Sequence, residues 1–154
     1  MAFTDQLVEV PQTSEVARYL IFFLGDELYA INTENVVEIL DNLAFTPIPT
    51  TAEWFLGVGN FHGEIVPVID IKAFQQKDRS LEPRKFIVLR SLKRKNFDIA
   101  IPVDTVCGIN SVDFEITGRA QEDSFLIAES VYNQKCLYLV DVERLIKEIL
   151  NRVK

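Results

Sequence analysis

The sequence predicts a mainly β protein of the all-β class, in which two small five-stranded β-barrels pack side by side and a C-terminal α-helix follows. Three observations predict this fold class. Short apolar runs of strand length are closely spaced by turn residues, with about five such runs in each half of the chain. The two halves repeat each other weakly, which is typical of two similar supersecondary units. The last segment changes to the apolar period of a helix.

Length and charge limit the classes to which the protein can belong. With 154 residues, 48% of them hydrophobic, the chain is long enough for one compact domain with a sizeable core. The net charge of −7 argues against a nucleic-acid partner, because phosphates require a basic surface. Apolar runs of membrane-span length and the pattern of a secretory signal are both absent from the sequence. We therefore expect no direct membrane insertion. Two cysteines are too few for a disulfide framework, which indicates a reducing, cytoplasmic compartment.

The first half begins with a polar arm and two apolar runs. Residues 1–16 are expected to form a flexible arm, since Pro11 interrupts any regular element there. Residues 17–24 and 28–31 are suited to buried strands around a turn at 25–27. Asn32 or Thr33 is placed to cap a short helical turn. After a break at 41–42, a further short strand is expected over residues 43–48.

Residues 55–70, FLGVGNFHGEIVPVID, predict a β-hairpin around which the rest of the chain is organised. Two apolar arms rich in branched residues flank a glycine-containing turn, so both arms are expected to be largely buried. Pro67 lacks a backbone donor and therefore indicates an edge position or a bulge. Gly57 and Gly59 are typical of a close approach by another backbone. The hairpin is thus predicted to be both a docking place and a part of the core.

A polar crossover separates the two halves. Residues 76–84 are charged and polar and end near Pro83, which indicates a connection between units. Strands are expected at 86–92 and 97–103, and an apolar run at 106–112 precedes a polar loop at 113–124. A second hairpin is expected from 125–131 and 135–140. We therefore predict one domain over 17–154, with a first barrel at about 17–75, a second at about 85–140 and a helix at 141–153.

The halves match at a spacing of 70 residues. Ala100 and Ile101 correspond in this way to Ala30 and Ile31, and further matches join Val36 to Val106, Ile39 to Ile109 and Phe55-Leu56 to Phe125-Leu126. Asp141 corresponds to Asp70 one residue further on, and both are expected to cap helical turns.

The same spacing predicts the environment of the two cysteines. Cys107 falls at the place of Val37, and Cys136 falls at the place of Val66. Both are therefore expected to be small, buried core residues.

The C-terminal helix has one apolar face. Apolar residues recur there at intervals of three and four, at Val142, Leu145, Ile146, Ile149, Leu150 and Val153. We interpret this face as closing one end of the barrels, with a partner-binding helix as the alternative.

The central hairpin also resembles a known family. The residues Gly57-Val58-x-Asn60-x-x-Gly63-x-Ile65-Val66-Pro67-Val68-Ile69-Asp70, with Leu24 to Ile31 and Val36 to Ile39 upstream, look like the signature of CheW-like domains, the coupling proteins of bacterial chemotaxis arrays. The resemblance covers roughly residues 17–150. It implies two five-stranded SH3-like barrels that share an apolar interface.

The resemblance also implies partners and a site. It implies a non-enzymatic adaptor that couples chemoreceptors, the methyl-accepting chemotaxis proteins, to a CheA-type histidine kinase, and that is membrane-associated only through receptor arrays. The implied partners are the cytoplasmic hairpin tip of a receptor and the regulatory domain of the kinase. The candidate partner-binding residues are Val36, Glu38, Gly57, Asn60, Phe61, His62 and Gly63.

His62 is the pointed departure from the family pattern. The family usually has Arg before the turn glycine, where this chain has His62, and the expected Glu38 would lie near it. Two interpretations stay open: His62 is an exposed turn residue, or it takes the place of the functional Arg. The change leaves room for a variant coupling protein of a pilus-motility or other non-flagellar chemosensory system.

Catalysis is not predicted. The chain has a single histidine and no glycine-rich phosphate loop, so no catalytic, cofactor-binding or metal-binding residues are assigned. An alternative of another class is a small β-barrel enzyme or ligand-binding module that uses His62 and nearby carboxylates. A basic run, Lys93-Arg94-Lys95, is interpreted as a solvated turn and not as a nucleic-acid site, because the chain as a whole is acidic.

Overall fold

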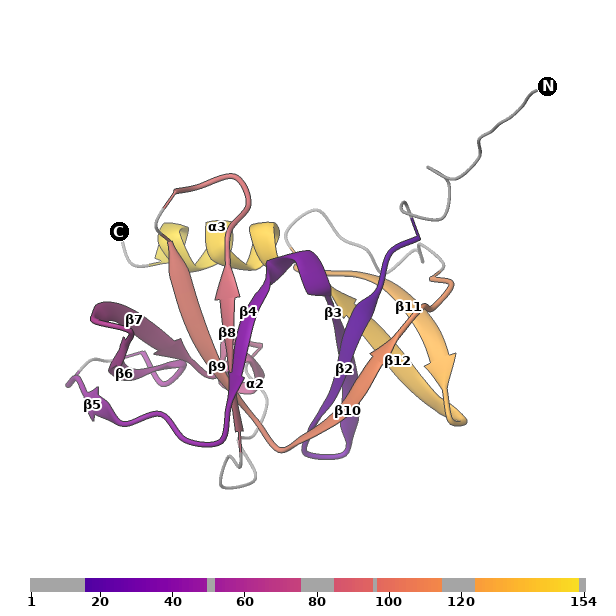
Figure 1. Ribbon diagram of the computed structural model, residues 1–154, viewed down its shortest axis with the longest axis horizontal. Helices are drawn as coiled ribbons and strands as arrows, with labels where there is room; N and C mark the ends of the chain where they lie inside the picture. The colour runs from indigo at the N-terminus through magenta and orange to yellow at the C-terminus, as the bar shows by residue number, and fades with distance from the viewer. Residues whose placement is uncertain (1–15, 50–51, 76–84, 96, 115–123, 153–154) are drawn as a thin grey trace.

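Two β-sheets and a C-terminal helix make up the computed structural model of the protein, which describes residues 16–49, 52–75, 85–95, 97–114 and 124–152 (Figure 1). The predicted mainly β class with a terminal helix is confirmed. The predicted arm at 1–16 lies outside the described residues except for its last position. The crossover at 76–84 and most of the loop at 113–124 also lie outside them.

The elements follow the predicted runs closely. In chain order they are β2 (Tyr19–Leu24), β3 (Glu27–Asn32), η1 (Thr33–Asn35), β4 (Val36–Leu40), β5 (Phe45–Pro47), β6 (Phe55–Phe61), β7 (Glu64–Ile69), α2 (Ile71–Phe74), β8 (Lys85–Arg90), β9 (Asp98–Val103), β10 (Thr105–Asn110), β11 (Leu126–Tyr132), β12 (Lys135–Val140) and α3 (Val142–Arg152).

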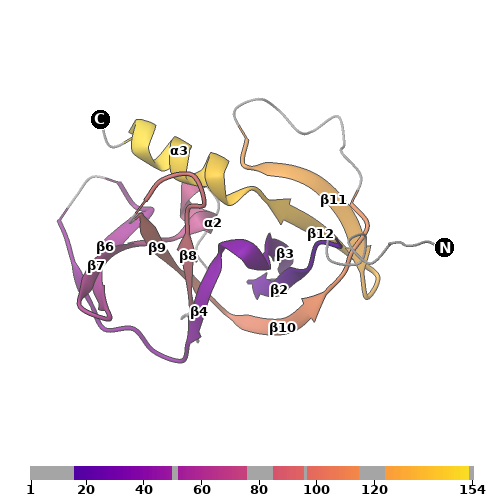
Figure 2. The same ribbon diagram turned by 45° about the horizontal axis from the view of Figure 1, so that its top comes forward.

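Each sheet takes strands from both halves of the chain. We call them the β2 sheet, in the order β10-β2-β3-β12-β11, and the β8 sheet, in the order β4-β8-β9-β7-β6-β5. The early hairpin β2–β3 thus lies between the late strands β10 and β12, and the late hairpin β8–β9 lies between β4 and β7. Figures 1 and 2 show the two sheets side by side. The predicted division at 17–75 and 85–140 therefore differs from the sheets, because the two halves exchange hairpins.

The exchange is symmetric, and it gives the repeat a structural meaning. In both sheets the inserted hairpin pairs antiparallel with one neighbour, β10 or β4, and parallel with the other, β12 or β7. The pairing register shifts between Val36 and Glu38 and again between Val106 and Gly108, so the spacing of 70 is right for β4 and β10.

The spacing changes to 71 in the second hairpin of each half. The backbone N–H of Asp70 donates to the carbonyl of Trp54, and that of Asp141 donates to Phe125, both at 2.8 Å. Trp54 is therefore the counterpart of Phe125, and the predicted match of Phe55-Leu56 with Phe125-Leu126 is wrong by one residue. Because side chains alternate between the faces of a strand, one residue reverses every inward and outward position.

The predicted burial of the two cysteines is wrong, and the shift explains the error for Cys136. Both Cys107 and Cys136 are exposed. At a spacing of 71, Cys136 corresponds to Ile65, whose exposed fraction is 74%, and not to the buried Val66. Cys107 does correspond to Val37, and each lies at a register shift in its strand, but Val37 packs against buried residues of the β8 sheet whereas Cys107 is exposed. The match in sequence therefore placed Cys107 correctly along its strand but did not fix what packs against it.

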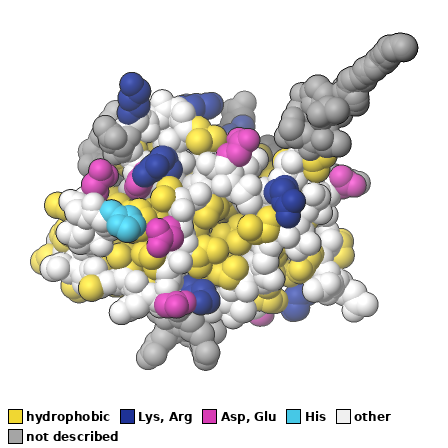
Figure 3. Space-filling model, in the orientation of Figure 1, with side chains coloured by type: hydrophobic (Ala, Val, Ile, Leu, Met, Phe, Trp, Pro, Cys, Tyr) yellow, Lys and Arg dark blue, Asp and Glu magenta, His cyan; other side chains and the backbone are white. Residues whose placement is uncertain are grey.

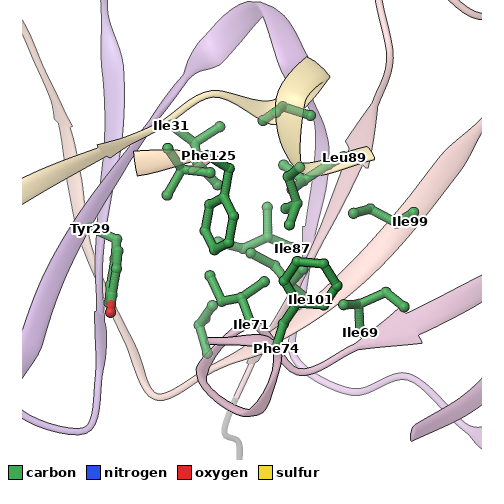
Figure 4. Packing of buried hydrophobic residues seen from close by; sticks show 14 of the residues in the cluster. Tyr29, Ile31, Ile69, Ile71, Phe74, Ile87, Leu89, Ile99, Ile101 and Phe125 are labelled. Carbon is green, nitrogen blue, oxygen red and sulfur yellow. The ribbon is translucent and has the colours of Figure 1, made fainter. Parts of the chain in front are cut away.

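The largest core cluster lies between the sheets and beneath α3. Residues from β2, β3, β7, β8, β9 and α2 meet α3 there, and Phe74 and Phe125 approach with ring centroids 5.8 Å apart (Figure 4). Val142, Leu145, Ile146 and Ile149 are all buried, which confirms that the apolar face of the helix covers the core. Asp141 accepts a hydrogen bond from the backbone of Arg144, and Asp70 accepts from Lys72 and Ala73, so both predicted caps are confirmed.

Candidate partner-binding site

The turn between β6 and β7 is a two-residue hairpin loop. Phe61 pairs with Glu64 across it, and the two central residues have positive φ angles, 52° for His62 and 83° for Gly63. This is the pattern of a type I′ turn, whose twist matches that of the flanking strands. Histidine is among the few residues enriched at positive φ, and glycine adopts it without steric cost. The sequence therefore places the imidazole at the very tip of the hairpin.

Asn60 fixes the conformation of this turn. Its side-chain Oδ1 accepts a hydrogen bond from the backbone N–H of Gly63 at 2.9 Å. Such a local side-chain bond to the backbone is typical of asparagine in turns. The amide of Asn60 is thus engaged within the turn, and its structural role is to position His62 and Gly63.

Phe61 is part of the core and supports His62 from below. Its exposed fraction is 7%, and it packs in a second apolar cluster with Leu43, Val66, Val68, Phe86, Val88 and Ala100. Its ring meets the imidazole of His62 at a centroid distance of 4.3 Å in an edge-on geometry. Of the candidate residues, Phe61 therefore acts through packing and not through an exposed surface.

Glu38 reaches the tip from β4. Its Oε1 lies 3.4 Å from Nε2 of His62, and the side chains are 46% and 73% exposed respectively. Because the pair is solvated, we expect it to contribute at most about 1 kcal/mol, and only when the imidazole is protonated. In the sheet order β8 and β9 lie between β4 and β7, so this contact shows that the β8 sheet curls until its ends approach.

Gly57 and Val36 lie away from the tip. Gly57 has a φ of 155°, and a Cβ at this position would collide with the backbone of Thr46 in β5. The predicted close approach at Gly57 is thereby confirmed. Val36 begins β4 and packs against the cluster between the sheets. Contacts among the described residues join five of the candidates into one group: Glu38, Asn60, Phe61, His62 and Gly63. Gly57 lies outside this group, four residues before Phe61 in β6.

An exposed isoleucine at the tip was missed by sequence reasoning. Ile65 pairs directly with Asn60 and has an exposed fraction of 74%. The sequence feature that could have indicated this exposure is the alternation of side chains between the two faces of β7, because Ile65 directly precedes the inward-facing Val66. In Figure 3 the chain's single histidine, in cyan, lies on a surface that carries both acidic and hydrophobic side chains. Apolar and polar groups side by side are a common composition of protein interfaces.

A second ion pair lies near Glu64, the first residue of β7. Arg90 in β8 donates to both oxygens of Asp98 in β9, at 2.9 and 3.0 Å. The hydrogen bond to Asp98 raises the pKa of Arg90, and the charges of Asp98 and of Glu64 in β7 act in the same direction. The surface beside His62 therefore carries fixed charges of both signs.

Among the described residues there is no group of three or more His, Cys, Asp or Glu side chains that could hold a metal ion. The imidazole of His62 contacts the carboxylate of Glu38 and the ring of Phe61. Among the helices in the described ranges, none has the length and apolar character needed to cross a membrane.

Comparisons with known proteins agree on one family. A family model described as "CheW-like domain" matches residues 18–150. The chain is 30% identical over 135 residues to a Chemotaxis protein CheW of Klebsiella aerogenes, covering 83% of this chain and 80% of that one. It is 25% identical over 142 residues to Protein FrzA of Myxococcus xanthus, covering 87% of this chain and 88% of that one. In fold it is similar to the scaffolding protein TtCheW of Thermoanaerobacter tengcongensis, with a TM-score of 0.69 and 23% identity over 80% of this chain and 88% of that one.

Proposed function

The chain belongs to the CheW-like domain family, and from this premise we propose that it is a non-enzymatic adaptor that couples chemoreceptors to a CheA-type histidine kinase. The observation that carries the proposal is the match over residues 18–150, which covers both sheets and most of α3. A relative named as a chemotaxis protein and a similar structure titled as a scaffolding protein support the same role.

The mechanism that we propose is scaffolding on two separate faces. One face is the hairpin tip with Glu38, Asn60, His62 and Gly63, which Phe61 joins to the second apolar cluster, within the β8 sheet. A partner that contacts the β8 sheet and one that contacts the β2 sheet are then kept in a fixed relative geometry. No chemical step is required of the adaptor itself, since a change in the receptor alters kinase output through position alone.

A variant coupling protein of a pilus-motility or other non-flagellar system is the second candidate. It is favoured by His62, which stands where the resemblance implies an arginine. An arginine offers five donors in a fixed fork and is always charged, whereas an imidazole offers at most two donors and is smaller. A partner surface that fits His62 and Glu38 at 3.4 Å therefore differs from one that fits a guanidinium.

Isothermal titration calorimetry tests the proposed function. The protein is titrated with the regulatory domain of a CheA-type kinase from the same genome and, separately, with the cytoplasmic hairpin of a receptor. We expect dissociation constants of about a micromolar, the range of transient signalling contacts. An absence of heat with every kinase and receptor of that genome contradicts the adaptor function.

A further inference from the structure

The loop between β8 and β9 carries a run of three positive charges. Lys93, Arg94 and Lys95 are consecutive and all exposed, in a chain whose net charge is −7. Within the described part of the chain, no ion pair involves these three side chains. Figure 3 shows Lys and Arg side chains at its upper left, where the loop lies in Figure 1. Three adjacent like charges repel one another, and a bound negative charge relieves that repulsion.

The backbone under these charges is held by a buried serine. The Oγ atom of Ser91 accepts hydrogen bonds from the backbone N–H groups of Lys93, at 3.1 Å, and Arg94, at 2.9 Å. The N–H of Ser91 donates to the carbonyl of Phe97 at 3.1 Å, which closes the loop. Because Ser91 is only 5% exposed, these bonds are sheltered from water. The loop therefore presents its cations from a defined backbone.

Glu143 fixes the same loop to the helix. Its carboxylate accepts from Ser91 Oγ at 2.7 Å, from the N–H of Leu92 at 2.6 Å and from Asn35 Nδ2 at 3.2 Å. Burial by itself raises the pKa of Glu143, but these hydrogen bonds and the charge of Lys93 together lower it. The base of the loop is thus connected to both η1 and α3. An ordinary solvated turn requires none of these bonds.

Leu92 adds an apolar group beside the charges. Its exposed fraction is 59%, although it follows directly on the buried Ser91. A small anion gains nothing from contact with an apolar side chain, whereas a peptide segment can place an apolar side chain of its own against Leu92. The acidic total of the chain disfavours a nucleic acid or an anionic membrane, because both require a broad basic surface.

We propose that the β8–β9 loop is a docking surface for an acidic segment of a protein partner. Lys93 and Arg94 pair with carboxylates of the segment, and Leu92 contacts an apolar residue next to them. The argument for this occupant is charge complementarity on a backbone that Ser91 and Glu143 already order, so little entropy is lost when the segment binds. This surface shares no residue with the hairpin tip, and its occupancy does not depend on the adaptor function.

Fluorescence anisotropy with defined probes tests the proposal on the full chain. The probes are a short labelled peptide of glutamates interrupted by leucines, a peptide of glutamates alone, and vesicles that contain phosphatidylserine. We expect the mixed peptide to bind best and its affinity to fall as salt is added. The double variant Lys93→Glu/Arg94→Glu should weaken it by about tenfold or more, and Leu92→Ser should remove its advantage over the glutamate peptide.

The matched control reverses equal charge elsewhere. Arg18→Glu/Lys135→Glu changes exposed cations that lie outside the β8 sheet, and it should leave the affinity within about twofold. Circular dichroism shows that each variant is folded. Equal binding of the mixed peptide by both double variants overturns the proposal. It is also overturned if the vesicles bind at this loop and the peptide does not.

Discussion

Glu38 Oε1 and His62 Nε2 lie 3.4 Å apart, although their strands are separated by β8 and β9 in the sheet order. The contact joins β4 to the tip of the β6–β7 hairpin across the open end of the β8 sheet. Phe61 supports the imidazole from the core side, and Asn60 fixes the turn beneath it. The tip is therefore ordered in the isolated chain, before any partner binds.

Substitution of His62 tests whether this tip binds a partner. We expect His62→Ala to weaken cognate binding by about 1 kcal/mol, the usual value of one hydrogen bond, and His62→Arg to change the preference between partners. Calorimetry at neutral and mildly acidic pH makes the comparison. If all three proteins bind alike at both pH values, His62 is an ordinary exposed turn residue.

Gly57 and Gly108 form a natural pair for testing close approach. Both have positive φ angles, but a Cβ at Gly57 meets the backbone of Thr46, while nothing lies within 4 Å of one at Gly108. We expect Gly57→Ala to lower the free energy of unfolding by about 2 kcal/mol or more, and Gly108→Ala by about 1 kcal/mol from backbone strain alone. Urea denaturation measures both. Equal losses of unfolding free energy in the two variants would contradict the close approach, because they would show that β5 accommodates the added Cβ at no cost.

The bulkier change Gly57→Asp is expected to abolish partner binding. Circular dichroism then separates a blocked site from an unfolded hairpin. Unchanged binding by a folded Gly57→Asp variant removes Gly57 from the candidate residues.

The exposure of the cysteines predicts their reactivity. Cys107 and Cys136 should both react with a thiol reagent in the native state, which single-cysteine variants and mass spectrometry can follow. Partial burial raises the pKa of Cys107, so its labelling should accelerate as the pH rises. If either cysteine is labelled only after denaturation, its side chain is buried in the native protein and this prediction is contradicted.

Glu143 predicts a loss of stability in acid. Its pKa is lowered from the ordinary value of 4.5 in the folded protein, so its contribution is complete above that pH and is lost as the pH falls through the lower, folded value. Glu143→Gln should therefore reduce stability at neutral pH and flatten its decline in acid. Glu53→Gln, at an exposed position, serves as the control. Parallel pH profiles of the wild type and Glu143→Gln would contradict the role of this carboxylate.

Local features of the fold could be predicted from the sequence because they depend on neighbours in the chain. The hairpin around His62, the caps at Asp70 and Asp141 and the apolar face of α3 are of this kind. The exchange of hairpins between the sheets could not be predicted from the sequence. The pairing of β3 with β12, and not with β7, depends on contacts between residues more than a hundred positions apart. The prediction that Cys136 is buried was wrong for a related reason. One added residue in the second half changes the spacing from 70 to 71 and places Cys136 on the outward face of its strand.

The candidate site was predicted in part. The resemblance brought Glu38 and His62 together, and the structure places them in contact. The resemblance did not distinguish Phe61, which belongs to the core, from its exposed neighbours. The burial of Phe61 depends on apolar side chains of β4 and β8 that pack against it, and these are distant in the sequence. Ile65 was overlooked because an outward isoleucine looks like any other strand residue in the sequence.

Sedimentation velocity of the protein with both proposed partners tests the central claim most directly. The regulatory domain of the kinase and the receptor hairpin are added together and then singly, with the His62→Ala variant in parallel. Two separate faces predict one faster-sedimenting species that contains all three components, and a smaller amount of it for the variant. If the receptor hairpin instead displaces the kinase domain, the two share one face and the scaffolding mechanism is contradicted.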